Sequence, residues 1–217
     1  GPTWGTFSVG GAWLVTQLFD NYLYTRDENF LKELFPVMKG SVEFFLDFLV
    51  EHPNGKWLVT NPSTSPENPP EGPGYKYFFD EVTGSFYFTT ICYGSSIDMQ
   101  ILSDLFSNFL EASELLNLEV GMAEKVRIAK SKLIPPQIGS DGTLQEWAED
   151  YGQMEPKHRH SSHMYGLYPG NVISLKKTPE LIPACKKVLE MRGDGAAGWS
   201  RGWKMAIWAR LGDGNRC

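Results

Sequence analysis

The residues best suited to chemistry gather in one part of the chain, where carboxylates and a tryptophan are followed closely by histidines. Residues 142–150 read GTLQEWAED, and residues 158–163 read HRHSSH. Three of the four histidines of the chain fall in that second stretch. Neither stretch has the 3.6-residue period of an amphipathic helix. We therefore predict that the two stretches build a site, the plain alternative being a surface loop that happens to be polar.

Metal binding is one chemistry that these residue types allow. His158, His160 and His163, together with Glu146 or Asp150, could supply nitrogen and oxygen ligands to zinc. Alternate residues such as His158 and His160 would face apart in a strand, however, and no His-Glu-x-x-His helix accompanies them. We therefore predict no metal and no other cofactor.

Sugar binding is the other chemistry. A sugar offers hydroxyls in fixed directions and one or more apolar C–H faces, so its site combines carboxylates, imidazoles and aromatic rings. That mix of side chains is present here in Glu146, Trp147, His158, His160 and His163.

A long loop precedes this region and is predicted to be functional. Residues 61–94 contain five of the fourteen prolines, several glycines and many aromatic residues, which is more typical of a functional loop than of a connector. Prolines on both sides of Glu67 restrict the backbone there, so this carboxyl group is expected to be held in place.

The elements that must position these loops are predicted to be helices. Apolar residues recur every three or four positions over 13–22, 27–49, 96–116, 120–133, 179–191 and 199–211. Pro36 lies inside the second pattern and is expected to kink that helix or split it. Long helices alternating with site-bearing loops fit an all-α toroid of helix hairpins, with a few short strands and no parallel sheet.

Composition limits the partners. The 217 residues are 41% hydrophobic, which indicates one globular unit, and the net charge of −6 argues against nucleic acid or an anionic membrane as a partner. No apolar run is long enough to span a bilayer. Cys92, Cys185 and Cys217 are widely spaced, so buried free thiols are expected rather than a disulfide framework.

The ends of the sequence look like those of an excerpt. It begins at Gly1 without a methionine and stops in a Gly-Asp-Gly turn directly after a helical pattern. We expect a parent protein that continues in both directions.

Taken together, the motifs and their order resemble glycoside hydrolase family 95. The resemblance covers essentially the whole chain and is carried by residues 10–14 (GGAWL), 61–68 (NPSTSPEN), 144–147 (LQEW), 158–163 (HRHSSH), 166–169 (GLYP), 198–201 (GWSR) and 208–211 (WARL). Members of this family are chiefly α-L-fucosidases acting on terminal α-1,2-linked fucose, with some α-L-galactosidases. Their catalytic domain is an (α/α)6 barrel, so the resemblance implies that residues 1–217 are a fragment of one such domain, truncated at both ends.

The resemblance also implies an inverting mechanism and assigns its residues. Glu67, in the Ser-Pro-Glu-Asn motif, corresponds to the general acid. Asp213 is the best match for the water-activating aspartate, although Asp-Gly is also an ordinary turn dipeptide. The family's pair of water-orienting asparagines should lie upstream of Gly1, so the isolated fragment is expected to be inactive.

Sugar contacts and cell location follow from the same resemblance. The residues expected to bind substrate are Thr64, Glu146, Trp147, His158, His160, His163 and Trp199. The fucose methyl group needs an apolar wall such as Trp147, Trp199 or Tyr168, and core packing is an equal alternative for Trp199. An α-L-galactosidase, another sugar hydrolase of this fold and a non-catalytic carbohydrate-binding module stay open as alternatives. The family is mostly secreted or periplasmic, and the same location is expected here.

Overall fold

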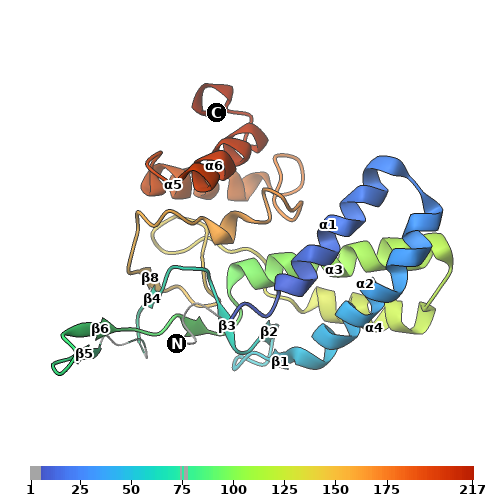
Figure 1. The fold of residues 1–217 in the computed structure, drawn as a ribbon, viewed down its shortest axis with the longest axis horizontal. Coiled ribbons are helices and arrows are strands. Elements are labelled where there is room, and N and C mark those ends of the chain that lie inside the picture. Colours follow the sequence, from blue (N-terminus) through green and yellow to red (C-terminus); the bar gives the residue numbers. More distant parts are fainter. Residues whose placement is uncertain (1–5, 74, 76–77) are drawn as a thin grey trace.

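The computed structural model describes residues 6–73, 75 and 78–217 and is mostly helical (Figure 1). The described part contains six α-helices, which follow the apolar periods of the sequence to within a few residues at each end. They are α1 (Gly10–Thr25), α2 (Glu28–Phe48), α3 (Ser96–Leu116), α4 (Val120–Ser131), α5 (Ile182–Arg192) and α6 (Gly198–Arg210). Short 3-10 turns add η2 (Ser162–Met164), η3 (Pro179–Leu181) and η4 (Gly214–Arg216).

The first two helices form a hairpin with a tight connection. Arg26 ends α1 in the left-handed conformation, with a φ of 56°, and its N–H is donated to the carbonyl of Tyr22. Asp27 then caps α2 by accepting hydrogen bonds from the N–H groups of Asn29 and Phe30. The expected split at Pro36 does not occur, and α2 runs through this residue. Leu34, Phe35 and Met38 on either side of it are buried in the core.

α3 lies at the centre of the larger core and contacts α1, α2 and α4. The rings of Phe35 in α2 and Phe109 in α3 are stacked, with 5.5 Å between their centroids. This helix buries residues on more than one face, including Asp98 and Gln100 near its start. It is therefore an inner helix, and its first turns can carry polar groups toward a site.

α5 and α6 belong to a second, smaller apolar cluster. Figure 1 shows these two helices together at the top of the molecule, away from α1 to α4. Their cluster includes Leu144, Met164, Cys185, Ile207 and Trp208. Met164, directly after the histidine stretch, belongs to this smaller cluster, whereas the next residue, Tyr165, belongs to the larger one.

All named strands are short and pair antiparallel in twos. β1 (Leu49–Glu51) pairs with β2 (Leu58–Thr60), and β5 (Phe78–Asp80) pairs with β6 (Ser85–Tyr87). β3 (Ser63–Thr64) pairs with β7 (Ile91–Cys92), and β4 (Pro70–Glu71) pairs with β8 (Gly152–Gln153). β3 and β4 flank the stretch that contains Glu67, so both ends of that stretch are fixed to other parts of the chain.

Two expectations about the chain concern its cysteines and its apolar runs. All three cysteines are free thiols, with Cys92 and Cys185 buried as expected and Cys217 exposed. Among the helices of the described residues, none combines the length and the hydropathy that crossing a bilayer requires.

Candidate active site

A cavity of about 340 Å³ brings together four of the predicted site residues, Thr64, Glu67, His160 and Trp199. We call it the Glu67 pocket. It lies between the start of α1, the loop after β3, the histidine stretch and the first turns of α6. Its described lining residues are Thr6, Phe7, Trp13, Thr64, Ser65, Pro66, Glu67, Thr90, Ile97, His160, Ser162, Trp199 and Trp203. Among them, Glu67 is the only carboxylate.

The Glu67 carboxylate is held by two neighbours from the histidine stretch. Its Oε2 atom lies 2.6 Å from Nη2 of Arg159 and 3.3 Å from Nε2 of His160. The side chain of Glu67 is 29% exposed, so it is accessible to a ligand in the pocket. Arg159 is half exposed, and its guanidinium forms an ion pair with Glu67.

His160 is held in its neutral form by burial. Burial lowers the pKa of His160 from its ordinary value of 6.5, and this effect outweighs the opposite influence of the Glu67 charge. At neutral pH the imidazole is therefore uncharged and lies beside Glu67 as a neutral ring rather than as a second cation.

Single hydroxyl groups tie the histidine stretch to its surroundings. The Oγ of Ser162 donates to the carbonyl of Pro66, directly before Glu67. The Oγ of Ser200, in α6, donates to the carbonyl of Arg159. The residues that contact the carboxylate are thus fixed to the loop on one side and to a helix on the other.

Aromatic rings form an apolar side of the Glu67 pocket. Trp199 is 55% exposed, and its ring lies 4.7 Å from the His160 ring, centroid to centroid. Trp203 donates from Nε1 to the carbonyl of Tyr168 over 2.7 Å, which fixes its ring beside Trp199. Trp13 and Phe7 add further apolar surface. A wall of this kind suits the C–H face of a sugar ring.

Glu146 occupies a different place, in the buried layer behind the Glu67 pocket. Its side chain is 1% exposed and accepts hydrogen bonds from Oγ of Ser65 at 2.7 Å and Nδ2 of Asn68 at 3.1 Å. Arg192, at the end of α5, pairs with it at 2.7 Å, and His163 Nδ1 lies 3.6 Å away. We call these five residues the Glu146 cluster. Since Ser65 and Asn68 flank Glu67, the cluster fixes the loop that carries it.

Glu146 stays ionised although it is buried, because its neighbours stabilise the carboxylate. Burial alone would raise the pKa of this carboxyl group, but His163, Arg192 and the hydrogen bond from Ser65 more than offset that effect. The net result is a pKa lowered to about 2, so Glu146 is ionised throughout the neutral range.

The other predicted sugar contacts do not line the Glu67 pocket. His163 is fully buried beside Glu146, and His158 is buried with its Nδ1 accepting the N–H of His160 at 3.0 Å. Trp147, 2% exposed, lines another cavity. Direct contact with sugar stays a prediction for these residues and for Glu146, whereas Thr64 and Trp199 already face the pocket.

The structure separates Asp213 from Glu67. Asp213 follows the last turn of α6, whereas Trp199, at the first turn of that helix, lines the pocket. Twelve or more residues of helix at about 1.5 Å each put roughly 18 Å between the two ends. Figure 1 likewise shows the C-terminal end at the top and β3 far below it. Asp213 does not line the Glu67 pocket, and its role as the water-activating residue stays a prediction.

The zinc site considered for the histidine stretch depends on how its side chains are arranged. None of their His, Cys, Asp and Glu side chains form a group of three that could hold a metal ion. His158 and His160 pack edge to face with 4.8 Å between centroids, and His163 is turned to Glu146 instead.

Sequence reasoning missed three members of the Glu146 cluster, namely Ser65, Asn68 and Arg192. Ser65 and Asn68 lie in the motif around Glu67 but carry no individual sign of a buried carboxylate partner. Arg192 ends a helix and looks like an ordinary cation at a helix C-terminus. Only the fold shows that it is buried against Glu146.

Comparison with known proteins gives a consistent result. The model of the "Glycosyl hydrolase family 95 catalytic domain" matches residues 1–217. "Alpha-L-fucosidase 2" of Arabidopsis thaliana is 40% identical over 210 residues, which cover 96% of this chain and 24% of that protein. "Probable alpha-fucosidase A" of Aspergillus niger is 28% identical over 219 residues, covering 96% of this chain and 26% of that protein. The chain thus spans about a quarter of the length of these relatives.

Glu146→Gln should destabilise the fold strongly. Losing this charge leaves Arg192 buried without its ionic partner, a change that typically costs about 3–5 kcal/mol of unfolding free energy. Urea denaturation followed by tryptophan fluorescence measures it. Glu190→Gln, an exposed change on α5, is the matched control and should stay within about 0.5 kcal/mol of wild type. A loss below about 1 kcal/mol for Glu146→Gln would contradict the bracing role of the Glu146 cluster.

His158 should make stability depend on pH. Burial, followed by the nearby His160, lowers the pKa of His158 below 6.5, so the unfolded chain takes up this proton first as the pH falls. Stability is therefore complete above about pH 6.5 and decreases as the pH falls below it. In His158→Asn, the amide oxygen can accept the same N–H without titrating. Thermal melting at pH 7.5 and 5.5 should show a smaller drop for this variant, and equal drops would exclude the contribution of His158.

Proposed function

This chain belongs to glycoside hydrolase family 95, and from that premise we propose that it supplies the proton-donor side of an α-L-fucosidase active site. The proposed reaction is inverting hydrolysis of terminal α-1,2-linked L-fucose on an oligosaccharide or glycan. The relatives "Alpha-L-fucosidase 2" and "Probable alpha-fucosidase A" support the reaction type. Linkage and stereochemistry come from the family resemblance noted in the sequence.

The observation that carries the proposal is the arrangement around Glu67. It is the only acidic side chain among the described residues of a pocket with an aromatic side, and the Glu146 cluster fixes the loop on both sides of it. Cleavage of a glycosidic bond needs a carboxylic acid that protonates the departing oxygen. In our proposal, Glu67 donates that proton.

Glu67 has to carry a proton when the reaction begins. Arg159 occupies Oε2 in this structure, so it has to leave that atom when the substrate binds. The side chain of Arg159 is half exposed, which allows it to turn toward solvent or toward a sugar hydroxyl. His160, uncharged at neutral pH, can stay beside the carboxyl group as a neutral neighbour.

Inversion needs a second group that activates water at about 6.5–9.5 Å from the acid. The described lining of the Glu67 pocket offers no second carboxylate, and Asp213 lies at the far end of α6. We therefore propose that the described helices are part of a longer (α/α)6 catalytic domain, whose other segments complete the site. The relatives, about four times as long, support this, and the chain alone is proposed to be inactive.

The apolar side of the pocket favours fucose over galactose. The two L-sugars differ at C5, where fucose has a methyl group and galactose a hydroxymethyl group. Trp13, Trp199 and Trp203 offer apolar surface, and the Nε1 of Trp203 already donates to the carbonyl of Tyr168. An α-L-galactosidase is the alternative.

Secretion or periplasmic export is also proposed from the family resemblance, and fractionation of producing cells tests it.

Glu67→Gln should abolish most hydrolysis. In the natural full-length protein we expect release of fucose from 2'-fucosyllactose to fall by about two to four orders of magnitude, the usual effect of removing a general acid. Glu71→Gln, four positions along the same loop and exposed, is the matched control and should retain activity near that of wild type. Full activity of Glu67→Gln would show that Glu67 is not the general acid. If the wild-type protein binds the sugar but does not hydrolyse it, a carbohydrate-binding module is the better description.

The first product should be β-L-fucose. Direct displacement by water inverts the α-anomeric carbon, whereas a covalent intermediate would return the α-anomer. Proton NMR within the first minutes of reaction, before mutarotation, distinguishes the two anomers. Initial release of α-L-fucose would contradict the inverting mechanism.

A further inference from the structure

An open groove continues from the Glu67 pocket, and we propose that it binds the sugar to which the fucose is attached. Its volume is about 560 Å³. The ligand is a neutral sugar ring on the leaving side of the bond that is cleaved. The inference rests on the proposed function, because it extends the same active site. We call it the tryptophan groove, and its described lining includes Trp13, Gln17, Tyr168, Trp199, Gly202 and Trp203.

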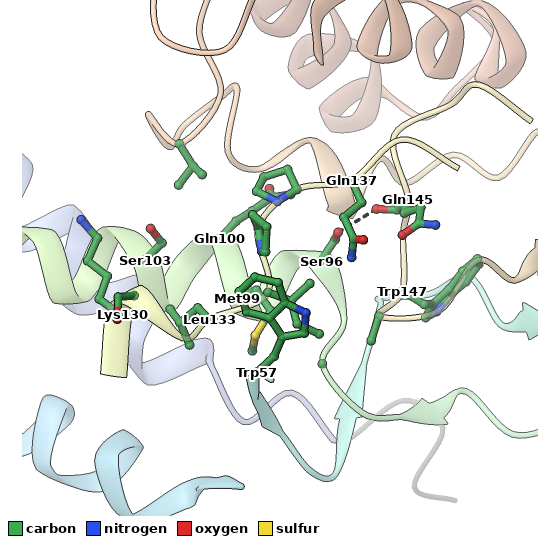
Figure 2. Close-up of a pocket in the computed structure, with 17 residues that line it drawn as sticks. Trp57, Ser96, Met99, Gln100, Ser103, Lys130, Leu133, Gln137, Gln145 and Trp147 are labelled. Atoms are coloured by element: carbon green, nitrogen blue, oxygen red, sulfur yellow. Dashed lines mark hydrogen bonds between the residues drawn. The ribbon is translucent and has the colours of Figure 1, made fainter. Parts of the chain in front are cut away.

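The tryptophan groove and the Glu67 pocket share three aromatic residues. Trp13, Trp199 and Trp203 line both cavities. By contrast, the cavity drawn in Figure 2, which has Trp57 and Met99 in its lining, shares no described lining residue with either of them. A ligand that fills the Glu67 pocket can therefore extend into the tryptophan groove along the same rings.

The tryptophan groove begins close to the proposed acid. The ring of Trp199 lies 4.7 Å from the ring of His160, centroid to centroid, and Nε2 of His160 lies 3.3 Å from Oε2 of Glu67. A general acid protonates the oxygen of the leaving sugar, so that sugar has to lie next to the acid. When fucose occupies the Glu67 pocket, Trp199 is therefore on the path of the sugar that leaves.

One face of α6 supplies much of the tryptophan groove. Trp199, Gly202, Trp203 and Ala206 all line it and are three or four residues apart, so they share a face of the helix. Gly202 lies inside the helix, where glycine is less favourable than alanine. A Cβ atom at this position would have open space around it. The described packing therefore does not require glycine here, and the space beside the two rings is open to a ligand.

The rings of the tryptophan groove are held in place before any ligand binds. Nε1 of Trp203 donates to the carbonyl of Tyr168 over 2.7 Å. The guanidinium of Arg210 lies 5.7 Å from the centroid of the Tyr168 ring, and its Nη1 lies 3.2 Å from Oδ1 of Asn171. A surface that is already ordered loses less side-chain entropy when a ligand binds to it.

The chemistry of the lining fits a neutral sugar. Tyr168 and Trp199 are 38% and 55% exposed, and accessible aromatic faces suit the apolar C–H face of a sugar ring. Gln17, exposed on α1, offers an amide donor and acceptor to the hydroxyl groups. None of the described lining residues is charged, so nothing there would compensate a charged ligand.

The dependence of hydrolysis on the leaving group tests the proposal in the full-length protein. Two substrates are compared, 2'-fucosyllactose and α-L-fucosyl fluoride, whose fluoride is too small to reach the tryptophan groove. Tyr168 lines the groove but not the Glu67 pocket. Tyr168→Ala should lower kcat/KM for 2'-fucosyllactose about three- to tenfold, the usual size of one aromatic contact, and change that for the fluoride less than about twofold.

A second variant blocks the tryptophan groove instead of removing a ring. Gly202→Leu adds bulk where the space is open and puts a better helix former into α6, so it should fold even if Tyr168→Ala does not. It should show the same selective loss with 2'-fucosyllactose. Tyr24→Ala, at an exposed ring near the end of α1, and Gly121→Leu, at an equally open position of α4, are the matched controls. Both should leave the hydrolysis of both substrates unchanged.

Saturation-transfer NMR gives a readout that needs no hydrolysis. Intact 2'-fucosyllactose is bound to the Glu67→Gln variant of the full-length protein. Saturation should reach the galactose protons as well as the fucose methyl group. Adding Gly202→Leu should remove the galactose signals and keep the methyl signal.

Two results would overturn the proposal. One is an equal effect of Tyr168→Ala and Gly202→Leu on both substrates, or no effect on either. The other is saturation that is confined to the fucose or absent. Failure of the proposed function looks different, because the wild-type protein would then hydrolyse neither substrate, and the NMR experiment alone would decide whether a sugar occupies the tryptophan groove.

Discussion

The geometry of the candidate site depends on one buried carboxylate, Glu146. An isolated charge in the protein interior is strongly unfavourable, and it is tolerated only when it is paired and hydrogen-bonded. Glu146 meets that condition through Arg192, Ser65 and Asn68, which come from α5 and from both sides of Glu67. The same contacts that allow the charge to be buried also fix the backbone on each side of the proposed acid.

The Glu146 cluster also joins the two apolar clusters of the fold. α1 to α4 share the larger one, and α5 and α6 belong to the smaller. Arg192 approaches from the smaller cluster, whereas Ser65 belongs to the loop that β3 and β7 fix next to α3. The position of Glu67 is therefore set by both halves of the molecule, although the residue itself lies on an irregular loop.

The sequence was a good guide to helices and a partial guide to the site. Apolar periods located all six helices of the described part because each buries a continuous stripe, and α2 continues through Pro36 because its neighbours are buried on both sides. Residue type and motif resemblance also selected Glu67, Thr64, His160 and Trp199, which do meet. They could not show that Glu146 and His163 lie behind the pocket, or that Asp213 lies at the opposite end of α6 from Trp199. Those facts depend on burial and distance, which residue types do not encode.

Two serine hydroxyls have a consequence for how the site can change during a turnover. Ser162 is anchored to the backbone before Glu67, whereas Ser200 is anchored to the backbone of Arg159. The loop that carries the carboxylate is thus attached to the histidine stretch through Ser162, whereas the backbone of its counter-ion Arg159 is attached to α6 through Ser200. In the proposed reaction, exchange of the counter-ion for an incoming hydroxyl would require only side-chain rotation, so the reorganisation energy would fall on a half-exposed arginine and the proposed proton donor would stay aligned.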